Sequence, residues 1–193
     1  MKMTENLLAQ LINTDTLLDS AYEMLATLDP NYEEEMASYH ESLQALTPVI
    51  SNVEDYILVL RQELVSGLRY ALWLGVQWNL ECFHNPVNKL MLNLDFEELC
   101  QESRMYTLPD AQNALSKTQA FVRSGPEEKR ELLDPITDHY SYLKTWGYKL
   151  VFCEGFRMAD GLLPHLIPAY TPDTMLSMRL EQKLYDSLGV ATA

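Results

Sequence analysis

Apolar residues recur at steps of three and four along most of this chain, and no long run alternates apolar with polar residues. A step of three or four places side chains on one face of an α-helix, whereas a strand needs a step of two. The spacing therefore predicts an all-α protein, a single-domain helical bundle of about six to eight helices.

Prolines divide the chain into segments, and several of them follow a residue that can cap a helix. Asp, Asn or Thr at the cap accepts a free backbone N–H, and proline tolerates the first helical position because its missing N–H is not needed there. We expect a helix to begin at each such pair. The pairs are Asp29-Pro30, Thr47-Pro48, Asn85-Pro86, Asp134-Pro135 and Thr171-Pro172.

Two long segments, 48–84 and 135–163, stand out because parts of them are apolar on nearly every helical face. In the first, this holds over 68–83, and in the second over 146–152. A helix that is apolar all round must be covered on all sides. We therefore expect these two helices to pack together at the centre of the protein.

The other segments are expected to surround this pair. Residues 1–46 are predicted to form an acidic helical hairpin on the exposed end of the first central helix. Residues 86–133 are predicted to form short helices, and 172–188 a last helix with Gly189 as its C-terminal cap. The whole chain, 1–193, is a suitable length for one domain.

Negative charge is concentrated near the N-terminus. The chain carries 28 Asp and Glu against 14 Lys and Arg, a net charge of −14, and the first 63 residues hold twelve of the acids and two of the bases. The densest group is Glu33, Glu34 and Glu35. Binding to a nucleic-acid backbone or an anionic membrane is disfavoured, because both require clusters of Lys and Arg.

Polar side chains interrupt both central segments at points where the two helices would meet. They are Asn79, Glu81 and His84 in the first and Lys149, Glu154, Arg157 and Asp160 in the second. The candidate site residues among them are Asn79, Glu81, His84, Glu154 and Arg157. A buried charge must be paired or become neutral, so a polar cluster in or beside the core is expected. It is either an ion-pair network that fixes the register of the helices or the lining of a ligand pocket.

No pattern indicates a metal centre or a catalytic site. Glu81 and His84 have the Glu-x-x-His spacing of di-iron proteins, which need two such motifs and two further glutamates, and this chain has one. Phosphate-binding, zinc-protease and nucleophile-elbow motifs are absent. We therefore expect no metal, no cofactor and no catalytic residue.

The location of the protein is predicted from what the sequence lacks. Cys82, Cys100 and Cys153 form no pairable framework, and each is expected to be a small buried apolar residue. No export signal is recognised, and the most apolar window, 71–83, is too short to span a membrane. A cytoplasmic protein is expected.

The functional hypothesis is a non-catalytic interaction or regulatory protein, whose partner is another protein or a second copy of this chain. The alternative is a small-molecule-binding protein or enzyme with a pocket between the two central helices. A further alternative is an acidic mimic of DNA that binds a basic protein through Glu33, Glu34 and Glu35. Homodimerisation through the N-terminal region is a separate hypothesis, because the apolar seams there need covering.

Overall fold

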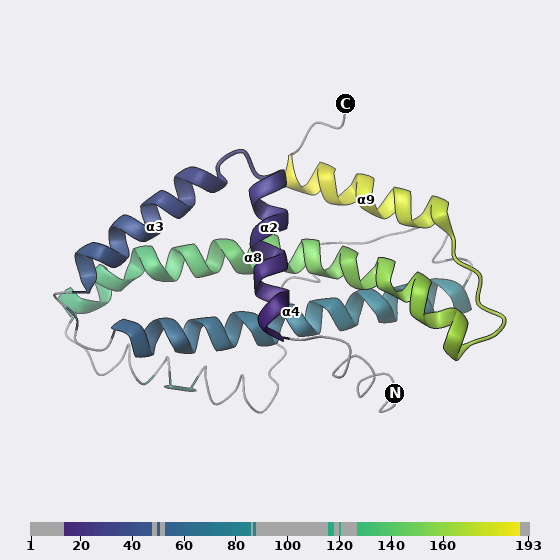
Figure 1. Ribbon diagram of the computed structural model, residues 1–193, viewed down its shortest axis with the longest axis horizontal. Helices are drawn as coiled ribbons and strands as arrows, with labels where there is room; N and C mark the ends of the chain where they lie inside the picture. Colours follow the sequence, from purple (N-terminus) through teal and green to yellow (C-terminus); the bar gives the residue numbers. More distant parts are fainter. Residues whose placement is uncertain are drawn as a thin grey trace.

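The protein is all-helical over the part of the chain that the computed structural model describes, which confirms the predicted fold class. Residues 14–47, 50, 53–85, 87, 116–117, 120 and 127–189 are described. They form five helices (Figure 1): α2 (Thr14–Leu28), α3 (Tyr32–Leu46), α4 (Val53–His84), α8 (Glu127–Leu166) and α9 (Thr174–Leu188). Most of the short helices predicted over 86–133 lie outside the described residues.

The two long helices, α4 and α8, pack side by side at the centre, as the sequence predicted, and they run in the same direction (Figure 1). The Tyr56 hydroxyl lies 2.8 Å from the Thr137 hydroxyl, and Asn79 Nδ2 lies 3.1 Å from Asp160 Oδ1. Both pairs are 81 residues apart in sequence. A constant separation between contacting residues is the signature of a parallel pair, because antiparallel helices would give a constant sum.

Glycines allow the backbones of these two helices to touch. A Cβ atom at Gly75 would overlap the carbonyl oxygen of Phe152 and would lie 2.7 Å from the backbone nitrogen of Phe156. On the other helix, a Cβ atom at Gly155 would overlap the carbonyl oxygen of Leu72. Only glycine, which has no Cβ, permits this approach. Each helix therefore presents a glycine to the backbone of the other.

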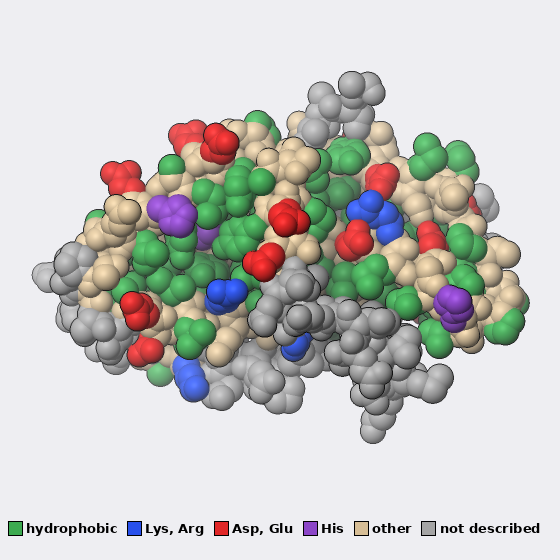
Figure 2. Space-filling view, in the orientation of Figure 1, with side chains coloured by type: hydrophobic (Ala, Val, Ile, Leu, Met, Phe, Trp, Pro, Cys, Tyr) green, Lys and Arg blue, Asp and Glu red, His purple; other side chains and the backbone are tan. Residues whose placement is uncertain are grey.

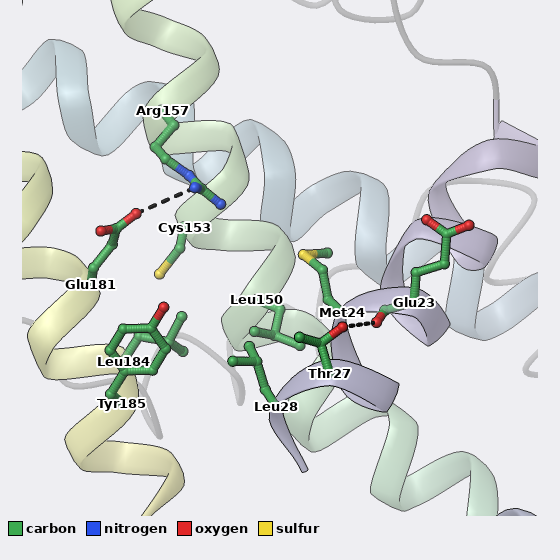
Figure 3. A pocket seen from close by; sticks show the side chains of 10 residues that line it. All are labelled: Glu23, Met24, Thr27, Leu28, Leu150, Cys153, Arg157, Glu181, Leu184 and Tyr185. Carbon is green, nitrogen blue, oxygen red and sulfur yellow. Dashed lines mark hydrogen bonds and ion pairs between the residues drawn. The ribbon is translucent and has the colours of Figure 1, made fainter. Parts of the chain in front are cut away.

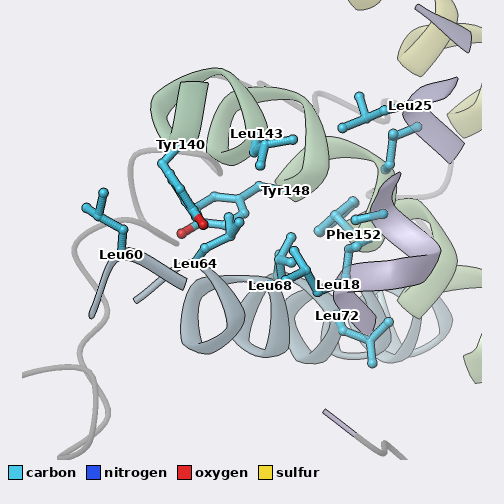
Figure 4. Packing of buried hydrophobic residues seen from close by; sticks show 14 of the residues in the cluster. Leu18, Leu25, Leu60, Leu64, Leu68, Leu72, Tyr140, Leu143, Tyr148 and Phe152 are labelled. Carbon is cyan, nitrogen blue, oxygen red and sulfur yellow. The ribbon is translucent and has the colours of Figure 1, made fainter. Parts of the chain in front are cut away.

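Buried leucines spaced four residues apart along α4 face the aromatic and aliphatic side chains of α8, and side chains of α2 close the same cluster (Figure 4). Burying one such side chain stabilises the fold by about 1.5–3 kcal/mol. This face is the centre of the core. Its members include Leu60, Leu64, Leu68 and Leu72 of α4, Tyr140, Leu143, Tyr148 and Phe152 of α8, and Leu18 and Leu25 of α2.

The shorter helices cover the central pair from one side. Helix α2 crosses it near Gly147, where an added Cβ would lie 3.9 Å from Ala21 Cβ, and α3 and α9 cover opposite ends of α8 (Figure 1). The predicted N-terminal hairpin on the first central helix is not confirmed. From the turn at Asp29–Asn31 the two helices diverge, and α3 packs mainly against α8 instead of α4. The chain changes direction there because α2 crosses the pair, whereas α3 runs along it.

The helix boundaries agree with the sequence prediction at Gly189 and differ from it at three of the prolines. Helix α8 already begins at Glu127 and contains Pro135, so the helix start predicted at Asp134-Pro135 is wrong. Packing of the neighbouring Ile136, which is fully buried, outweighs the backbone hydrogen bond that a proline removes. The predicted end of α9 is confirmed, since Gly189 caps it with a left-handed φ of 71°.

At two other prolines the helix begins slightly later than predicted. Helix α9 is capped by Asp173, whose carboxylate accepts a hydrogen bond from the Leu176 N–H at 3.2 Å, and not by Thr171. Helix α3 likewise follows Asn31. In both cases the capping residue–proline pair lies in the turn just ahead of the helix.

No helix among the described ranges is long and apolar enough to cross a membrane.

The glycine contact predicts the effect of adding a single methyl group. Gly75→Ala is expected to destabilise the protein by about 2–3 kcal/mol, because the backbones of α4 and α8 must separate. Gly161→Ala is the matched control on α8, since a Cβ there meets nothing within 4 Å, and it is expected to stabilise by up to about 1 kcal/mol. Urea unfolding followed by circular dichroism measures both. Equal effects at the two positions would contradict the close contact.

Candidate functional site

The structure does not bring the five predicted polar residues into one group. Asn79 is buried between α4 and α8, whereas Glu81 and His84 are exposed on α4. Glu154 and Arg157 lie on the side of α8 that faces α9, where they pair with each other. The predicted cluster is therefore divided between a buried network and a surface ion pair.

Asn79 belongs to a hydrogen-bonded network that joins α4, α8 and α9. Its amide nitrogen donates to the Phe156 carbonyl at 2.8 Å and to Asp160 Oδ1 at 3.1 Å. The Tyr170 hydroxyl lies 2.6 Å from Asn79 Oδ1 and 2.5 Å from Asp160 Oδ1, and the Ser177 hydroxyl donates to Asp160 Oδ2 at 3.1 Å. Because its side chains satisfy one another, this network holds the segment after α8 in place.

Sequence reasoning found only part of this network. Asp160 was visible as a charge on an otherwise apolar helix, but no local pattern marked Tyr170, which lies in the connection between α8 and α9. Burial, together with the hydrogen bond to Asp160, raises the pKa of the Tyr170 hydroxyl. The phenol therefore stays protonated and acts as a hydrogen-bond donor.

Arg157 links α8 to α9 at the surface. Its guanidinium lies 2.8 Å from Glu154 Oε2 and 3.3 Å from Glu181 Oε1, and these side chains are 39–49% exposed. Ion pairs this exposed contribute little to stability because water and salt screen them. They orient α9 more than they stabilise it.

A cavity of about 290 Å³ lies beside Arg157, between α2, α8 and α9 (Figure 3). Cys153 lines it, but its side chain is buried, and burial raises the pKa of the thiol. A protonated thiol is a poor nucleophile. The cavity therefore lacks an activated nucleophile, although it has the shape of a small pocket. Its lining consists of Glu23, Met24, Thr27, Leu28, Leu150, Cys153, Arg157, Glu181, Leu184 and Tyr185.

A buried histidine lies where α3 covers α8, and sequence reasoning did not single it out. His139 is 3% exposed and stacks on the Tyr39 ring, with ring centroids 4.0 Å apart and an interplanar angle of 19°. Neither ring nitrogen has a hydrogen-bond partner. Burial, and to a lesser extent the nearby His40, lower the pKa of His139 to about 4. Its position, three residues after the buried Ile136, is the one sequence signal for an inward-facing side chain.

The acidic residues Glu33, Glu34 and Glu35 occupy the first turn of α3, and all are exposed. Acidic side chains gather over the outer edge of α3 in Figure 2. The positive end of the helix dipole stabilises carboxylates in this position. Since the side chains remain accessible, they are available to a partner.

Within the described part of the chain, no group of three or more His, Cys, Asp or Glu side chains is arranged to hold a metal ion.

Comparison of the chain with known protein families, with curated proteins and with solved structures found no match.

Removing one hydroxyl tests the buried network. Tyr170→Phe is expected to destabilise the protein by about 1–3 kcal/mol, because Asn79 Oδ1 and Asp160 Oδ1 lose a buried donor. Tyr185→Phe, at a partly exposed position on α9, is the matched control and is expected to change stability by less than about 0.5 kcal/mol. Urea unfolding measures both variants. If Tyr170→Phe proves as mild as the control, the hydroxyl does not hold the network together.

Titration of His139 predicts a dependence of stability on pH. The folded protein keeps the ring neutral down to pH about 4, whereas the unfolded chain binds a proton near pH 6.5, so stability falls as the pH drops through this window. His139→Phe removes this contribution, which amounts to about 3 kcal/mol over the whole window. The free energy of unfolding of the wild type minus that of the variant should therefore decrease as the pH falls from 6.5 to 4 and stay constant above pH 6.5.

Unfolding free energies measured by urea denaturation between pH 4 and pH 8 provide this comparison. His139→Leu removes the stacked ring as well as the titration. It should therefore be less stable than His139→Phe while giving the same pH dependence. If the difference in unfolding free energy between the wild type and His139→Phe does not change with pH, His139 is not held neutral by burial.

Proposed function

We propose that this protein is a non-catalytic interaction protein that binds a basic partner through residues 14–47, which we call the acidic segment. The supporting observation is the charge of this segment, which contains eight Asp and Glu residues and no Lys or Arg. Six of the eight acidic side chains are exposed, two on α2 and four on α3. These are Asp19, Glu23, Glu33, Glu34, Glu35 and Glu41.

Electrostatics favours a positively charged partner. No described Lys or Arg forms an ion pair with Glu33, Glu34 or Glu35, so no described cation offsets the mutual repulsion of these three neighbouring carboxylates. A basic partner would relieve this repulsion and would be steered to the segment by its potential. A DNA-binding protein, for which the segment would imitate a phosphate backbone, is one special case.

The alternative of a pocket between the two central helices has less support. The backbones of α4 and α8 touch at Gly75 and Gly155, and Asn79 beside this contact is fully hydrogen-bonded. The arrangement leaves the centre of the pair filled with protein atoms. Homodimerisation stays a prediction, which static light scattering at micromolar concentration would test.

Charge removal tests the proposed partner class. A hexa-arginine peptide is expected to bind the wild-type protein at about 100 mM salt and to bind more weakly as salt rises. The triple variant Glu33→Gln, Glu34→Gln, Glu35→Gln should weaken this binding about tenfold or more, because it removes three unpaired carboxylates. Isothermal titration calorimetry provides the affinities.

The control variant carries the same change in charge elsewhere. Glu131→Gln, Asp134→Asn, Asp138→Asn neutralises three exposed carboxylates on α8 and should weaken binding less than about threefold. Equal losses from the two triple variants would mean that only net charge matters. No binding of the peptide to the wild-type protein would overturn the proposal.

A further inference from the structure

A groove of about 720 Å³ lies where the turn between α2 and α3 approaches the end of α9. We call it the C-terminal groove, and it is lined by residues 26–33, Trp146, Leu188 and Gly189. Its size falls in the range of pockets that bind small organic groups. Figure 1 shows the C-terminal ends of α2 and α9 meeting at this place.

Backbone carbonyls at the end of α2 lack the donors that a continuing helix would supply. Pro30 has no N–H, the Asn31 N–H donates to Asp29 Oδ1 at 2.9 Å, and the Tyr32 N–H donates to the Asp29 carbonyl at 3.1 Å. These are the three residues that would have bonded to the carbonyls of residues 26–28. Those carbonyls therefore remain as acceptors, and all three residues line the groove.

Two helix dipoles point their negative ends at this groove. The ends of α2 and α9 both border it, and neither helix has a basic residue in its last turn. A cation near a helix C-terminus is stabilised by the dipole, and a Lys, Arg or His in the last turn of the helix can supply it. Neither α2 nor α9 supplies such a residue in its own last turn.

The side chains that line the groove also favour a cation. Asp29 and Glu33 contribute carboxylates, Tyr32 and Trp146 contribute aromatic rings, and none of the eleven lining residues is Lys, Arg or His. The Asp29 residue is 5% exposed, and its carboxylate accepts hydrogen bonds from the Asn31 N–H and the Tyr142 hydroxyl, with no described cation paired to it. Aromatic faces beside carboxylates are typical of sites for organic cations.

We propose that the C-terminal groove binds the guanidinium group of an arginine side chain in the basic partner, an inference that rests on the proposed function. Guanidinium is planar, so it stacks on aromatic rings, and its five N–H donors match carbonyls and carboxylates together. An ammonium group has no flat face to stack. A bare metal ion would need several ligands at short distances, and no group of three or more His, Cys, Asp or Glu side chains among the described residues is arranged to hold one.

The experiment introduces a lysine whose ammonium group would occupy the groove in place of the partner's guanidinium. Ala26 is exposed, lines the groove and lies in the last turn of α2, so Ala26→Lys places an ammonium group where the ligand would bind. The variant should fold at least as well as the wild type, because lysine suits the last turn of a helix. It should weaken hexa-arginine binding about tenfold or more, as measured by calorimetry.

Two controls separate the groove from general charge effects. Ala26→Gln adds a neutral side chain of similar length, and Ala45→Lys adds the same charge at an exposed position in the last turn of α3. Each should weaken binding less than about threefold. In an NMR titration with hexa-arginine, the indole N–H signal of Trp146 should shift, whereas those of Trp73 and Trp78, which do not line the groove, should stay in place.

The outcomes distinguish this inference from the proposed function. If Ala26→Lys weakens binding no more than Ala45→Lys while the Glu33, Glu34, Glu35 triple variant still does, the groove assignment is overturned and the proposed function stands. If neither hexa-arginine nor ethylguanidinium binds, both are overturned. If ethylguanidinium shifts the Trp146 signal but hexa-arginine does not bind, the groove takes a free organic cation and the assignment to a protein partner is overturned.

Discussion

The backbone contact between α4 and α8 at Gly75 and Gly155 determines where the rest of the molecule can lie. Because carbonyl oxygens of each helix approach the glycine of the other, the two helices cannot slide without a clash. This register brings Asn79 to the Phe156 carbonyl and Asp160 to the same point. The core and the buried polar network therefore depend on one contact made by residues without side chains.

Because protein atoms fill the space between α4 and α8, the polar groups that a partner could contact lie on the surface of the protein. The polar groups near the glycine contact bond to one another, whereas Glu81, His84, Glu154 and Arg157 lie at the surface. The cavity beside Arg157 contains a thiol that burial keeps protonated. Among the described residues, the acidic segment and the groove at its turn are the surfaces that we propose for a partner.

The acidic segment and the C-terminal groove have a common electrostatic origin. Residues 14–47 contain no Lys or Arg, so neither the surface of α3 nor the end of α2 is neutralised by the helices themselves. The approach of α9 adds a second negative helix end at the same point. Residues 14–47 carry eight of the 28 acidic residues and no basic residue, and the groove at the turn between α2 and α3 is shaped to hold a cation.

The sequence by itself determined the helical class, the two central segments and the cap at Gly189, because spacing and capping are local properties. It misjudged Pro135, since burial of the following Ile136 keeps α8 continuous through the proline. Only the tertiary structure decided that α4 and α8 run in parallel and that α3 lies on α8, because a stripe of apolar residues defines a face and not the partner of that face. The candidate groove could not be predicted from the sequence for the same reason. The groove joins residues 26–33 to the end of α9, and no local pattern in either segment shows that their negative ends meet.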